Sequence, residues 1–363
     1  MKVLLVSDCV GGVFAYTLEL ADALRERSVR VALALMGREP TPAQALELAA
    51  RPWLDVDARP FRLVWMDAPW RDVARAGEWL LRLRDRVQPD IVQLNDLGHG
   101  VLPWHAPTVL VAHSCVPSWF QAVRGTAAPH SYDRYRERVR EGVQRCDVLV
   151  APTLAMLREF RRHHGRARCG MVVPNGIRQR LLPALRKGRF VASAGRMWDE
   201  AKNLAALDVA ASGLDWPVLV AGATAAPDAS EHAAAPRTLR MLGELPRARV
   251  QRLLRRAGVY AHPARYEPFG LAPLEAAVHG CALVLADLPS LREIWADAAL
   301  FAPPGDPDAL RAQLRRLLAD DALRTDFGVR ARARAAGFTA ARMARGYHDR
   351  YAALLARSEA PTR

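Results

Sequence analysis

Short apolar runs alternate with longer amphipathic segments along the whole chain. In its first half, the apolar runs lie at residues 2–7, 29–35, 91–94, 108–112, 147–151 and 171–173. Nearly continuous apolar runs of this length are typical of parallel strands that are buried on both faces. Segments 13–27 and 70–87, which lie between them, repeat apolar residues with the period of a helix. The first half therefore predicts strands and helices that alternate around a parallel sheet.

The same alternation starts again in the second half, with apolar runs at 190–194, 217–221, 238–242, 258–262, 282–286 and 300–301. Two such series predict an α/β protein with two doubly wound, Rossmann-like domains. We expect the first domain over 1–173, a linker over 174–189, the second domain over 190–338 and a final helix within 339–363. Ligands bind at the carboxyl ends of strands in such sheets, so two facing domains would form a cleft lined by the loops that follow strands.

Charge and composition argue against a nucleic-acid partner. The net charge is +14, but nearly every basic residue is arginine and alanine is very abundant. This pattern indicates a compositional bias, spread over both halves, rather than a stripe that follows phosphates. The positive charge could instead attract anionic substrates or an anionic membrane surface, and we keep this as an alternative.

The five cysteines are scattered and form no CxxC pair, which is typical of reduced thiols in a cytoplasmic protein. No apolar run approaches the 18 residues or so that a membrane-spanning helix needs. The adjacent His163 and His164 lie in an arginine-rich stretch, and we interpret them as a solvated loop. No His, Cys, Asp or Glu spacing predicts a metal site.

Two loops that follow strands in the first half carry candidate binding residues. Gly11 and Gly12 stand where the first strand turns into a helix, so the backbone there can approach an anion closely. The sequence lacks the dinucleotide-binding and Walker A patterns, and a plain tight turn is the alternative. His113 follows the strand at 108–112, and a purely structural histidine is the alternative there.

The strand at 190–194 leads to Arg196 and Lys202, two cations that flank a turn before a helix. Such a pair can clamp a diphosphate, whereas two solvated charges are the simpler alternative. Lys202 is informative because the chain otherwise has only Lys2 and Lys187, which suggests that a compact charge is needed at this position.

The segment from Glu267 to Glu275 places carboxylates at both ends of a short apolar stretch. Pro268 disfavours a helical conformation at Glu267, so Glu267 belongs to a loop. Phe269, Gly270 and Leu271 then open a helix whose first N–H groups lack helical partners. Carboxylates accept hydrogen bonds from hydroxyl groups, so this arrangement fits a ligand with hydroxyls on both sides of a phosphate, such as a nucleotide-sugar.

This segment, EPFGLAPLE, resembles the E-x7-E signature of retaining nucleotide-sugar glycosyltransferases of glycosyltransferase family 4, which have the GT-B fold. Gly-Gly followed by LELADAL, VPNGI at 173–177 and GRMWDEAKN at 195–203 extend the resemblance, which is clearest from 171 to 293. It implies two Rossmann-like domains facing a cleft, with the last helix crossing back to the first domain.

The resemblance also implies roles for the candidate residues. Glu267 would bind hydroxyls of the donor sugar and Glu275 would hold the ribose, while Arg196 and Lys202 would neutralise the departing diphosphate. His113 would lie near the transferred sugar. The remaining candidates would bind the donor through their backbone amides: Gly11, Gly12, Phe269, Gly270 and Leu271. The expected catalytic residues are His113, Arg196, Lys202 and Glu267.

The implied activity is metal-independent, retaining transfer of a sugar from a nucleotide-diphosphate-sugar to the hydroxyl of a glycoconjugate, glycolipid, polysaccharide or small molecule. No cofactor is expected beyond this substrate. Asp55–Asp57 (DVD) resembles the metal-binding motif of a different glycosyltransferase fold, and we attribute it to chance. A sugar-nucleotide epimerase of the same architecture and a non-catalytic nucleotide-sugar-binding protein are the alternatives.

Two positions depart from the family pattern. Arg178 follows PNGI where the family usually has Asp, and Asn95-Asp96 stands where many members have a second histidine. Both departures lie in regions that shape the acceptor side and the hinge.

Overall fold

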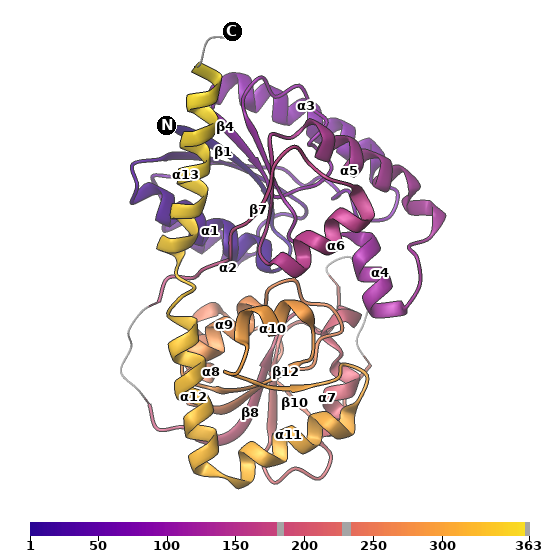
Figure 1. The fold of residues 1–363 in the computed structure, drawn as a ribbon, viewed down its shortest axis with the longest axis vertical. Helices are drawn as coiled ribbons and strands as arrows, with labels where there is room; N and C mark the ends of the chain where they lie inside the picture. Colours follow the sequence, from indigo (N-terminus) through magenta and orange to yellow (C-terminus); the bar gives the residue numbers. More distant parts are fainter. Residues whose placement is uncertain (180–184, 227–233, 360–363) are drawn as a thin grey trace. The chain divides into compact units, whose positions relative to one another are not determined.

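The structure is a computed structural model that describes residues 1–179, 185–226 and 234–359. The chain forms two compact units (Figure 1). The first comprises Met1–Gln121, Thr126–Arg178 and Ala340–Arg363, and the second comprises Ala122–Gly125 and Gln179–Thr339. Each unit is built on its own parallel sheet.

The first sheet has seven parallel strands in the order β3-β2-β1-β4-β5-β6-β7. Because β1 pairs with both β2 and β4, the chain winds away from β1 in both directions, as in a doubly wound fold. The strands are β1 (Lys2–Asp8), β2 (Arg30–Met36), β3 (Asp55–Ala58), β4 (Ile91–Leu94), β5 (Thr108–Val111), β6 (Val148–Ala151) and β7 (Gly170–Val172).

Strand β3 is absent from the sequence-based prediction. Its residues, Asp-Val-Asp-Ala, form no apolar run, yet they pair with β2 at the edge of the sheet. The carboxylate of Asp57 lies 3.2 Å from Nε of Arg59 and 3.1 Å from Nη2 of Arg86. The DVD sequence thus belongs to an edge strand whose second aspartate forms ion pairs with arginines.

The helices associated with the first sheet are α1 (Gly12–Arg25), α2 (Pro42–Ala49), α3 (Trp70–Val87), α4 (Val116–Arg124), α5 (Asp133–Arg145), α6 (Leu154–His164) and α13 (Ala340–Glu359). The helix predicted at 70–87 is confirmed. The interpretation of His163 and His164 as a solvated loop is wrong, because both belong to the last turn of α6. His164 is buried against Phe160, and this burial lowers its pKa to about 3.

Helix α13 returns to the first unit and packs on α1 (Figure 1). Its first residue, Ala340, donates its amide to the carbonyl of Ile177 at 3.1 Å. A Cβ on Gly346 would lie 3.1 Å from Val173, so a glycine allows the helix to approach the chain closely there. The predicted return of the final helix to the first domain is confirmed.

The second sheet has six parallel strands in the order β10-β9-β8-β11-β12-β13. They are β8 (Gly188–Ala194), β9 (Val218–Ala221), β10 (Arg240–Met241), β11 (Ala257–His262), β12 (Ala282–Ala286) and β13 (Leu300–Ala302). The helices of this unit are α7 (Leu204–Ala211), α8 (Arg247–Arg256), α9 (Leu271–Val278), α10 (Pro289–Trp295), α11 (Pro307–Ala319) and α12 (Asp321–Ala335), with a 3-10 turn, η2, at Glu200–Lys202.

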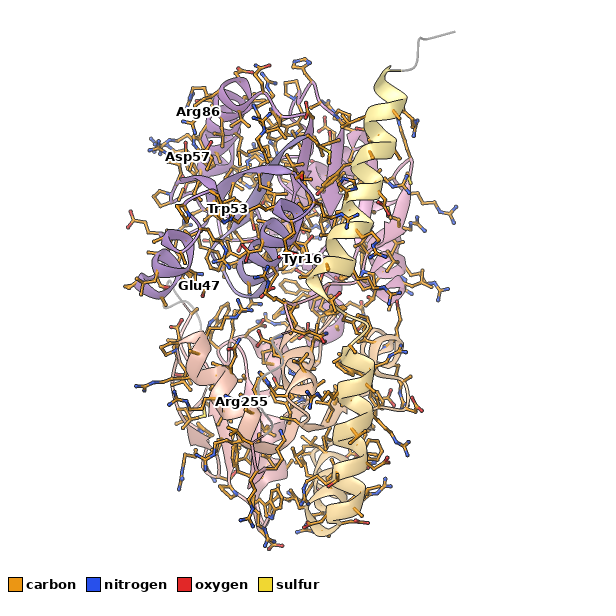
Figure 2. All side chains as sticks on the ribbon, turned by 90° about the vertical axis from the view of Figure 1, so that its left-hand side faces the viewer. Tyr16, Glu47, Trp53, Asp57, Arg86 and Arg255 are labelled. Atoms are coloured by element: carbon orange, nitrogen blue, oxygen red, sulfur yellow. The ribbon has the colours of Figure 1, made fainter. Side chains whose placement is uncertain are left out.

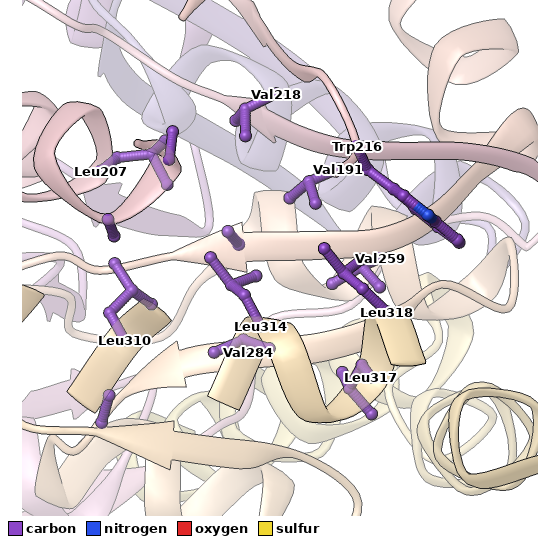
Figure 3. Close-up of a cluster of buried hydrophobic side chains, with 14 of the residues drawn as sticks. Val191, Leu207, Trp216, Val218, Val259, Val284, Leu310, Leu314, Leu317 and Leu318 are labelled. Atoms are coloured by element: carbon purple, nitrogen blue, oxygen red, sulfur yellow. The ribbon is translucent and has the colours of Figure 1, made fainter. Parts of the chain in front are cut away.

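One face of the second sheet packs against α11 in an apolar core (Figure 3). Leu310, Leu314 and Leu317 are spaced by four and three residues, so they lie on the same face of α11 and point toward the strands. Each of these leucines is fully buried or nearly so. Burial of a leucine contributes about 1.5–3 kcal/mol, so α11 holds the sheet firmly beneath the loops that follow its strands.

The ends of β8 and β9 approach each other too closely for a side chain. A Cβ on Gly222 would lie 1.7 Å from the carbonyl oxygen of Gly195, and Gly222 has a φ of +145°. Only glycine fits there. The amide of Gly195 also donates to Ala221 at 3.0 Å, which holds the start of the loop that carries Arg196 and Lys202.

Candidate active site

In the first unit, the two candidate glycines lie at the start of α1, as predicted. Gly11 has a φ of +73°, and α1 begins at Gly12. The carboxylate of Asp8 accepts a hydrogen bond from the amide of Val10 at 2.7 Å, which shapes the turn out of β1. The first N–H groups of a helix have no helical acceptors and attract anions, so this turn can present backbone amides to a phosphate.

His113 lies two residues after the end of β5 and is half-buried. Its Nε2 lies 3.1 Å from Oδ1 of Asn95, and the ring of Tyr16 meets it edge-on at a centroid distance of 4.5 Å. Burial lowers the pKa of His113 to about 3, so the imidazole is neutral at physiological pH. A neutral imidazole has one donor nitrogen and one acceptor nitrogen.

The two departures from the family pattern are both held by contacts within the first unit. Arg178 donates its amide to Glu19 Oε2 at 2.7 Å, and its guanidinium pairs with Glu26, so Arg178 is attached to α1. Asp96 accepts from the amide of Gly98 at 2.9 Å, and the same oxygen lies 2.5 Å from Nδ1 of the buried His99. Asp96 therefore shapes its own loop.

In the second unit, Arg196 and Lys202 both lie in the loop that follows β8, but they have different partners. The guanidinium of Arg196 lies 3.0 Å from Asp199 and over the ring of Trp198. Asp199 also accepts from the amide of Ala201 at 3.0 Å, which begins the turn η2. Lys202, at the end of η2, points to the loop that follows β11.

The loop after β11 places a buried carboxylate between two nitrogen atoms. Oε2 of Glu267 accepts from Nζ of Lys202 at 2.8 Å and from Nε2 of His262 at 2.9 Å. The side chains of Lys202 and Glu267 are 17% and 13% exposed, so this pair is poorly screened by solvent. The three residues, Lys202, His262 and Glu267, are called the trio below.

Electrostatics keeps the Glu267 carboxylate ionised. Burial alone would raise its pKa, but the charge of Lys202 and the hydrogen bond from His262 outweigh burial and hold the pKa well below its usual range. Burial lowers the pKa of His262, against the opposing influence of Glu267. The hydroxyl of Ser290 also donates to the Glu267 carbonyl at 2.5 Å, which fixes the backbone of the loop.

Helix α9 begins directly after this loop, as predicted. Gly270 is its N-cap residue with a φ of +92°, a conformation that favours glycine, and Leu271 is its first residue. Glu275 lies one turn into the helix, where its carboxylate is 3.9 Å from Nη2 of Arg247 at the start of α8. Glu267 and Glu275 therefore have different cationic partners.

Sequence reasoning missed His262 and Arg247. His262 ends a strand directly, and that position could have identified it, as it identified His113. Arg247 offers no comparable signal, since it belongs to a helix in which five of ten residues are arginine. The pairing of Lys202 with Glu267 was also not predicted, because the two are 65 residues apart in the sequence.

A separate hollow of about 460 Å³ lies at the amino ends of the first sheet's strands, away from the candidate residues. Trp53 and Arg86, which line it, lie on this part of the first unit together with Asp57 (Figure 2). Helices α1 and α3 end here, and Lys2 donates to the carbonyl of Val87 at 2.5 Å. Cations stabilise the negative end of a helix, which explains the basic lining without a ligand.

Comparisons with known families match both halves of the chain. Residues 10–180 match the family model described as Glycosyltransferase Family 4, and residues 184–334 match the model described as Glycosyl transferases group 1.

Two curated relatives are mannosyltransferases. The O-antigen chain mannosyltransferase B of Escherichia coli is 37% identical over 101 residues, which cover 28% of this chain and 26% of the relative. The phosphatidyl-myo-inositol mannosyltransferase of Mycolicibacterium smegmatis is 34% identical over 155 residues, which cover 40% of each chain. The chain thus aligns with less than half the length of either relative.

Solved structures match nearly the whole chain. Sucrose-phosphate synthase from Thermosynechococcus elongatus has a TM-score of 0.77 at 18% identity and covers 98% of this chain and 100% of its own. HepE from Anabaena, in complex with UDP-glucose, has a TM-score of 0.74 at 17% identity and covers 97% and 100%. At these identities the likeness concerns the fold.

The chain therefore has the GT-B fold, and both of its halves match glycosyltransferase family models. The predicted fold class is confirmed. Within the described part of the chain, no helix combines the length and the apolar character needed to cross a membrane. In the same part, no group of three or more His, Cys, Asp or Glu side chains is arranged to hold a metal ion.

The depressed pKa of Glu267 predicts a specific pH dependence of stability. An unfolded glutamate has a pKa of about 4.3, so at lower pH the unfolded chain binds more protons than the folded one. The contribution of Glu267 is then fully present at neutral pH and is lost as the pH falls through its folded pKa. We expect Glu267→Gln to lower the free energy of unfolding by roughly 1.5–3 kcal/mol at about pH 7 and by clearly less at about pH 3.5.

Urea denaturation of the parent and variant at the two pH values measures this difference. Glu244→Gln, which changes an exposed carboxylate, is the matched control and should have little effect at either pH. An equal loss of stability at both pH values would show that the shape of the glutamate matters and its charge does not.

Proposed function

We propose that the chain is a retaining glycosyltransferase that moves a sugar from a nucleotide-diphosphate-sugar to an acceptor hydroxyl. The observation that carries this proposal is the trio of Lys202, His262 and Glu267, which joins the segments at the carboxyl ends of β8 and β11 and places Glu267 four residues before Leu271, the first residue of α9. A lysine and a helix N-terminus suit phosphates, and an ionised carboxylate suits hydroxyls. HepE, a protein of the same fold, binds UDP-glucose in its crystal structure.

Each part of the donor has a proposed partner in the second unit. Lys202 and Arg196 neutralise the diphosphate, and Glu267 accepts hydrogen bonds from hydroxyls of the sugar. Glu275 accepts from the ribose hydroxyls. The backbone amides at the start of α9 contact the sugar and the phosphate, through Phe269, Gly270 and Leu271.

In the first unit, we propose roles for the glycine turn and for His113. The amides of Gly11 and Gly12 bind phosphate oxygens, because they lie at the start of α1. His113 contacts a hydroxyl of the transferred sugar through its ring, which is neutral and half-buried.

Catalysis in this proposal depends on stabilising the negative charge of the leaving group. Negative charge builds on the diphosphate as the bond between sugar and phosphate breaks, and fixed cations stabilise that charge more strongly in the transition state than in the bound donor. Arg196 and Lys202 supply positive charge without a metal ion, so we propose that the reaction is metal-independent.

We propose retention of the anomeric configuration by attack on the face from which the diphosphate leaves. Retention through two inversions requires a carboxylate that is able to attack the anomeric carbon. Glu267 is held by Lys202 and His262 and is assigned to sugar hydroxyls. A same-face attack through an oxocarbenium-like state needs no such nucleophile.

The donor sugar is proposed to be a hexose, because the curated relatives are mannosyltransferases and glycogen synthases. The acceptor is a hydroxyl of a glycoconjugate, glycolipid, polysaccharide or small molecule. Contact with an anionic membrane surface would bring a lipid-linked acceptor within reach, and the net charge of +14 favours such contact.

The activity can be tested by incubating the purified chain with a panel of uridine and guanosine diphosphate sugars and mixed glycoside acceptors. We expect a glycoside product whose anomeric configuration, determined by NMR, matches that of the donor. The yield should be unchanged in EDTA. Inverted product, or activity lost in EDTA and restored by Mg²⁺ or Mn²⁺, would contradict the corresponding part of the proposal. An epimerised donor formed without acceptor would favour the epimerase.

Substitution Lys202→Ala tests the role of the lysine in the transition state. We expect kcat to fall by roughly 100-fold or more, with a smaller rise in the donor KM, because the clamp acts mainly as charge develops on the diphosphate. Steady-state kinetics on the folded variant measures both constants. Arg252→Ala, which removes an exposed cation from α8, is the control and should leave kcat near that of the parent. A normal kcat in Lys202→Ala would refute this role.

Substitutions of Glu267 and Glu275 should have different effects on binding and on kcat if the two glutamates hold different parts of the donor. Glu275→Gln should weaken binding of the nucleoside diphosphate by about 10- to 150-fold, which corresponds to the loss of a charged acceptor worth roughly 1.5–3 kcal/mol. Glu267→Gln should leave that binding close to the parent value and should lower kcat, because its proposed partner is the sugar.

Calorimetric titration of both variants with the nucleoside diphosphate of the active donor decides between these outcomes. Thermal unfolding recorded in parallel identifies any variant that has merely lost stability. If both variants bind the diphosphate as the parent does, Glu275 acts only as a charge near the start of a helix, paired with Arg247.

A further inference from the structure

A buried chain of hydrogen bonds leads from helix α13 to His113. Tyr351 on α13 donates its hydroxyl proton to Oε1 of Gln93 on β4. Nε2 of Gln93 lies 3.2 Å from Oδ1 of Asn95, and the same Oδ1 lies 3.1 Å from Nε2 of His113. Gln93 and Tyr351 are fully buried and Asn95 is 6% exposed, so water contributes little to these bonds.

A second branch reaches the same amide from α13. Nε2 of Gln93 also donates to the hydroxyl of Tyr16 at 3.2 Å, and Tyr16 donates to the hydroxyl of Tyr347 at 2.7 Å. Two tyrosines of one helix therefore act on opposite ends of one amide. Tyr351 contacts the oxygen of Gln93 directly, and Tyr347 acts on its nitrogen through Tyr16.

The direction of these bonds determines the protonation of the histidine. A primary amide has one acceptor end and one donor end, so the orientation of Gln93 dictates the orientation of Asn95. Because Oδ1 of Asn95 accepts from Gln93, it also faces His113 as an acceptor. His113 must then carry its proton on Nε2, which leaves Nδ1 as a hydrogen-bond acceptor.

We propose that Gln93 and Asn95 transmit the hydrogen-bond direction set by α13 to His113 and so fix its Nε2–H tautomer. Gln93, Asn95 and Tyr347 are positioning residues in this scheme, since they act through the histidine. The purpose of the tautomer rests on the proposed function, in which Nδ1 of His113 accepts a hydrogen bond from a sugar hydroxyl.

The hydrogen bonds can also all run in the opposite donor-to-acceptor direction, if the side-chain amides of Gln93 and Asn95 both exchange their oxygen and nitrogen positions. Tyr347 then donates to Tyr16, and Tyr16 donates to the oxygen of Gln93. Nδ2 of Asn95 in turn donates to Nε2 of His113, which moves the imidazole proton to Nδ1. The two directions are close in energy because, in the direction shown, Nδ2 of Asn95 is buried with no partner among the described residues. A single hydroxyl group can therefore decide between them.

Two matched substitutions on α13 separate the proposal from a general loss of packing. Tyr347→Phe removes the acceptor for the proton of Tyr16, and an unpaired buried donor is harder to tolerate than an unpaired acceptor. The network should then reverse, so that Tyr16 donates to Gln93. Tyr351→Phe removes a donor, and the one atom that newly loses its partner is an acceptor, the oxygen of Gln93, so the original direction should persist.

The tautomer can be measured without any substrate. Long-range ¹H–¹⁵N NMR spectra of the full chain labelled with ¹⁵N-histidine distinguish protonated from unprotonated ring nitrogens at about pH 7.5, and the His113→Gln variant assigns the signals. We expect Nε2–H in the parent and in Tyr351→Phe, and a majority of Nδ1–H in Tyr347→Phe. In a Gln93→Met background, Tyr347→Phe should have no further effect. Circular dichroism checks that each variant is folded.

An Nδ1–H tautomer in the parent, or the same tautomer in both tyrosine variants, would overturn the proposal. A transfer assay then tests its purpose, and kcat/KM of Tyr347→Phe should fall roughly 3- to 10-fold below that of Tyr351→Phe. A changed tautomer with unchanged transfer would refute the role of Nδ1 and leave the coupling intact. If the parent transfers no sugar, the proposed function fails, and the NMR spectra still decide on the coupling.

Discussion

The ion pair between Lys202 and Glu267 is the interaction on which the candidate site of the second unit depends. It joins the loop after β8 to the loop after β11, alongside a backbone hydrogen bond from the amide of Arg265 to the carbonyl of Ala201 at 2.8 Å and a bond from the side chain of Asn203 to the carbonyl of Pro263 at 2.9 Å. His262 adds a second hydrogen bond to the same carboxylate oxygen. Two donors on one oxygen restrict the carboxylate more than either would alone, and a restricted carboxylate costs less entropy when it binds a ligand.

The positions of these loops are set by a glycine and by apolar packing, and do not depend on the ion pair alone. Gly222 lets β9 approach Gly195 at the end of β8, and α11 covers the sheet beneath with a row of leucines. The ion pair is therefore formed between two ends that are already held in register by parallel strands. This order matters energetically, because a buried pair stabilises a protein only where its geometry is good enough to offset desolvation.

Much of the fold follows from the sequence because parallel strands and amphipathic helices have distinct hydrophobic periods. The helix at 70–87 and the strand at 91–94 were predicted with their observed bounds. Strand β3 was not, because an exposed edge strand needs no apolar run and its pairing with β2 depends on a distant segment. His164 was misassigned for the reverse reason, since an arginine-rich segment can still bury one face of a helix.

The candidate site was predictable only in its parts. A position directly after a predicted strand identifies His113, the spacing of Glu267, Pro268 and Glu275 identifies Glu267, and the rarity of lysine marks Lys202. The contacts of these residues are set by neighbouring strands that are distant in sequence, so no spacing rule predicts that Lys202 meets Glu267. The network behind His113 is less predictable still, because Tyr347 and Tyr351 reach it from the far end of the chain.

The pairing of Lys202 with Glu267 also bears on the proposed binding of the donor. Burial removes hydration from a charged group, and the 2.8 Å contact with the Glu267 carboxylate offsets that loss for Lys202. Because an ammonium group has three donor hydrogens, Lys202 can bond Glu267 and a phosphate oxygen at once. In the proposed reaction, the attraction between Lys202 and the diphosphate grows as charge moves onto the leaving group, so the lysine would favour the transition state over the ground state, which is the difference that accelerates a reaction.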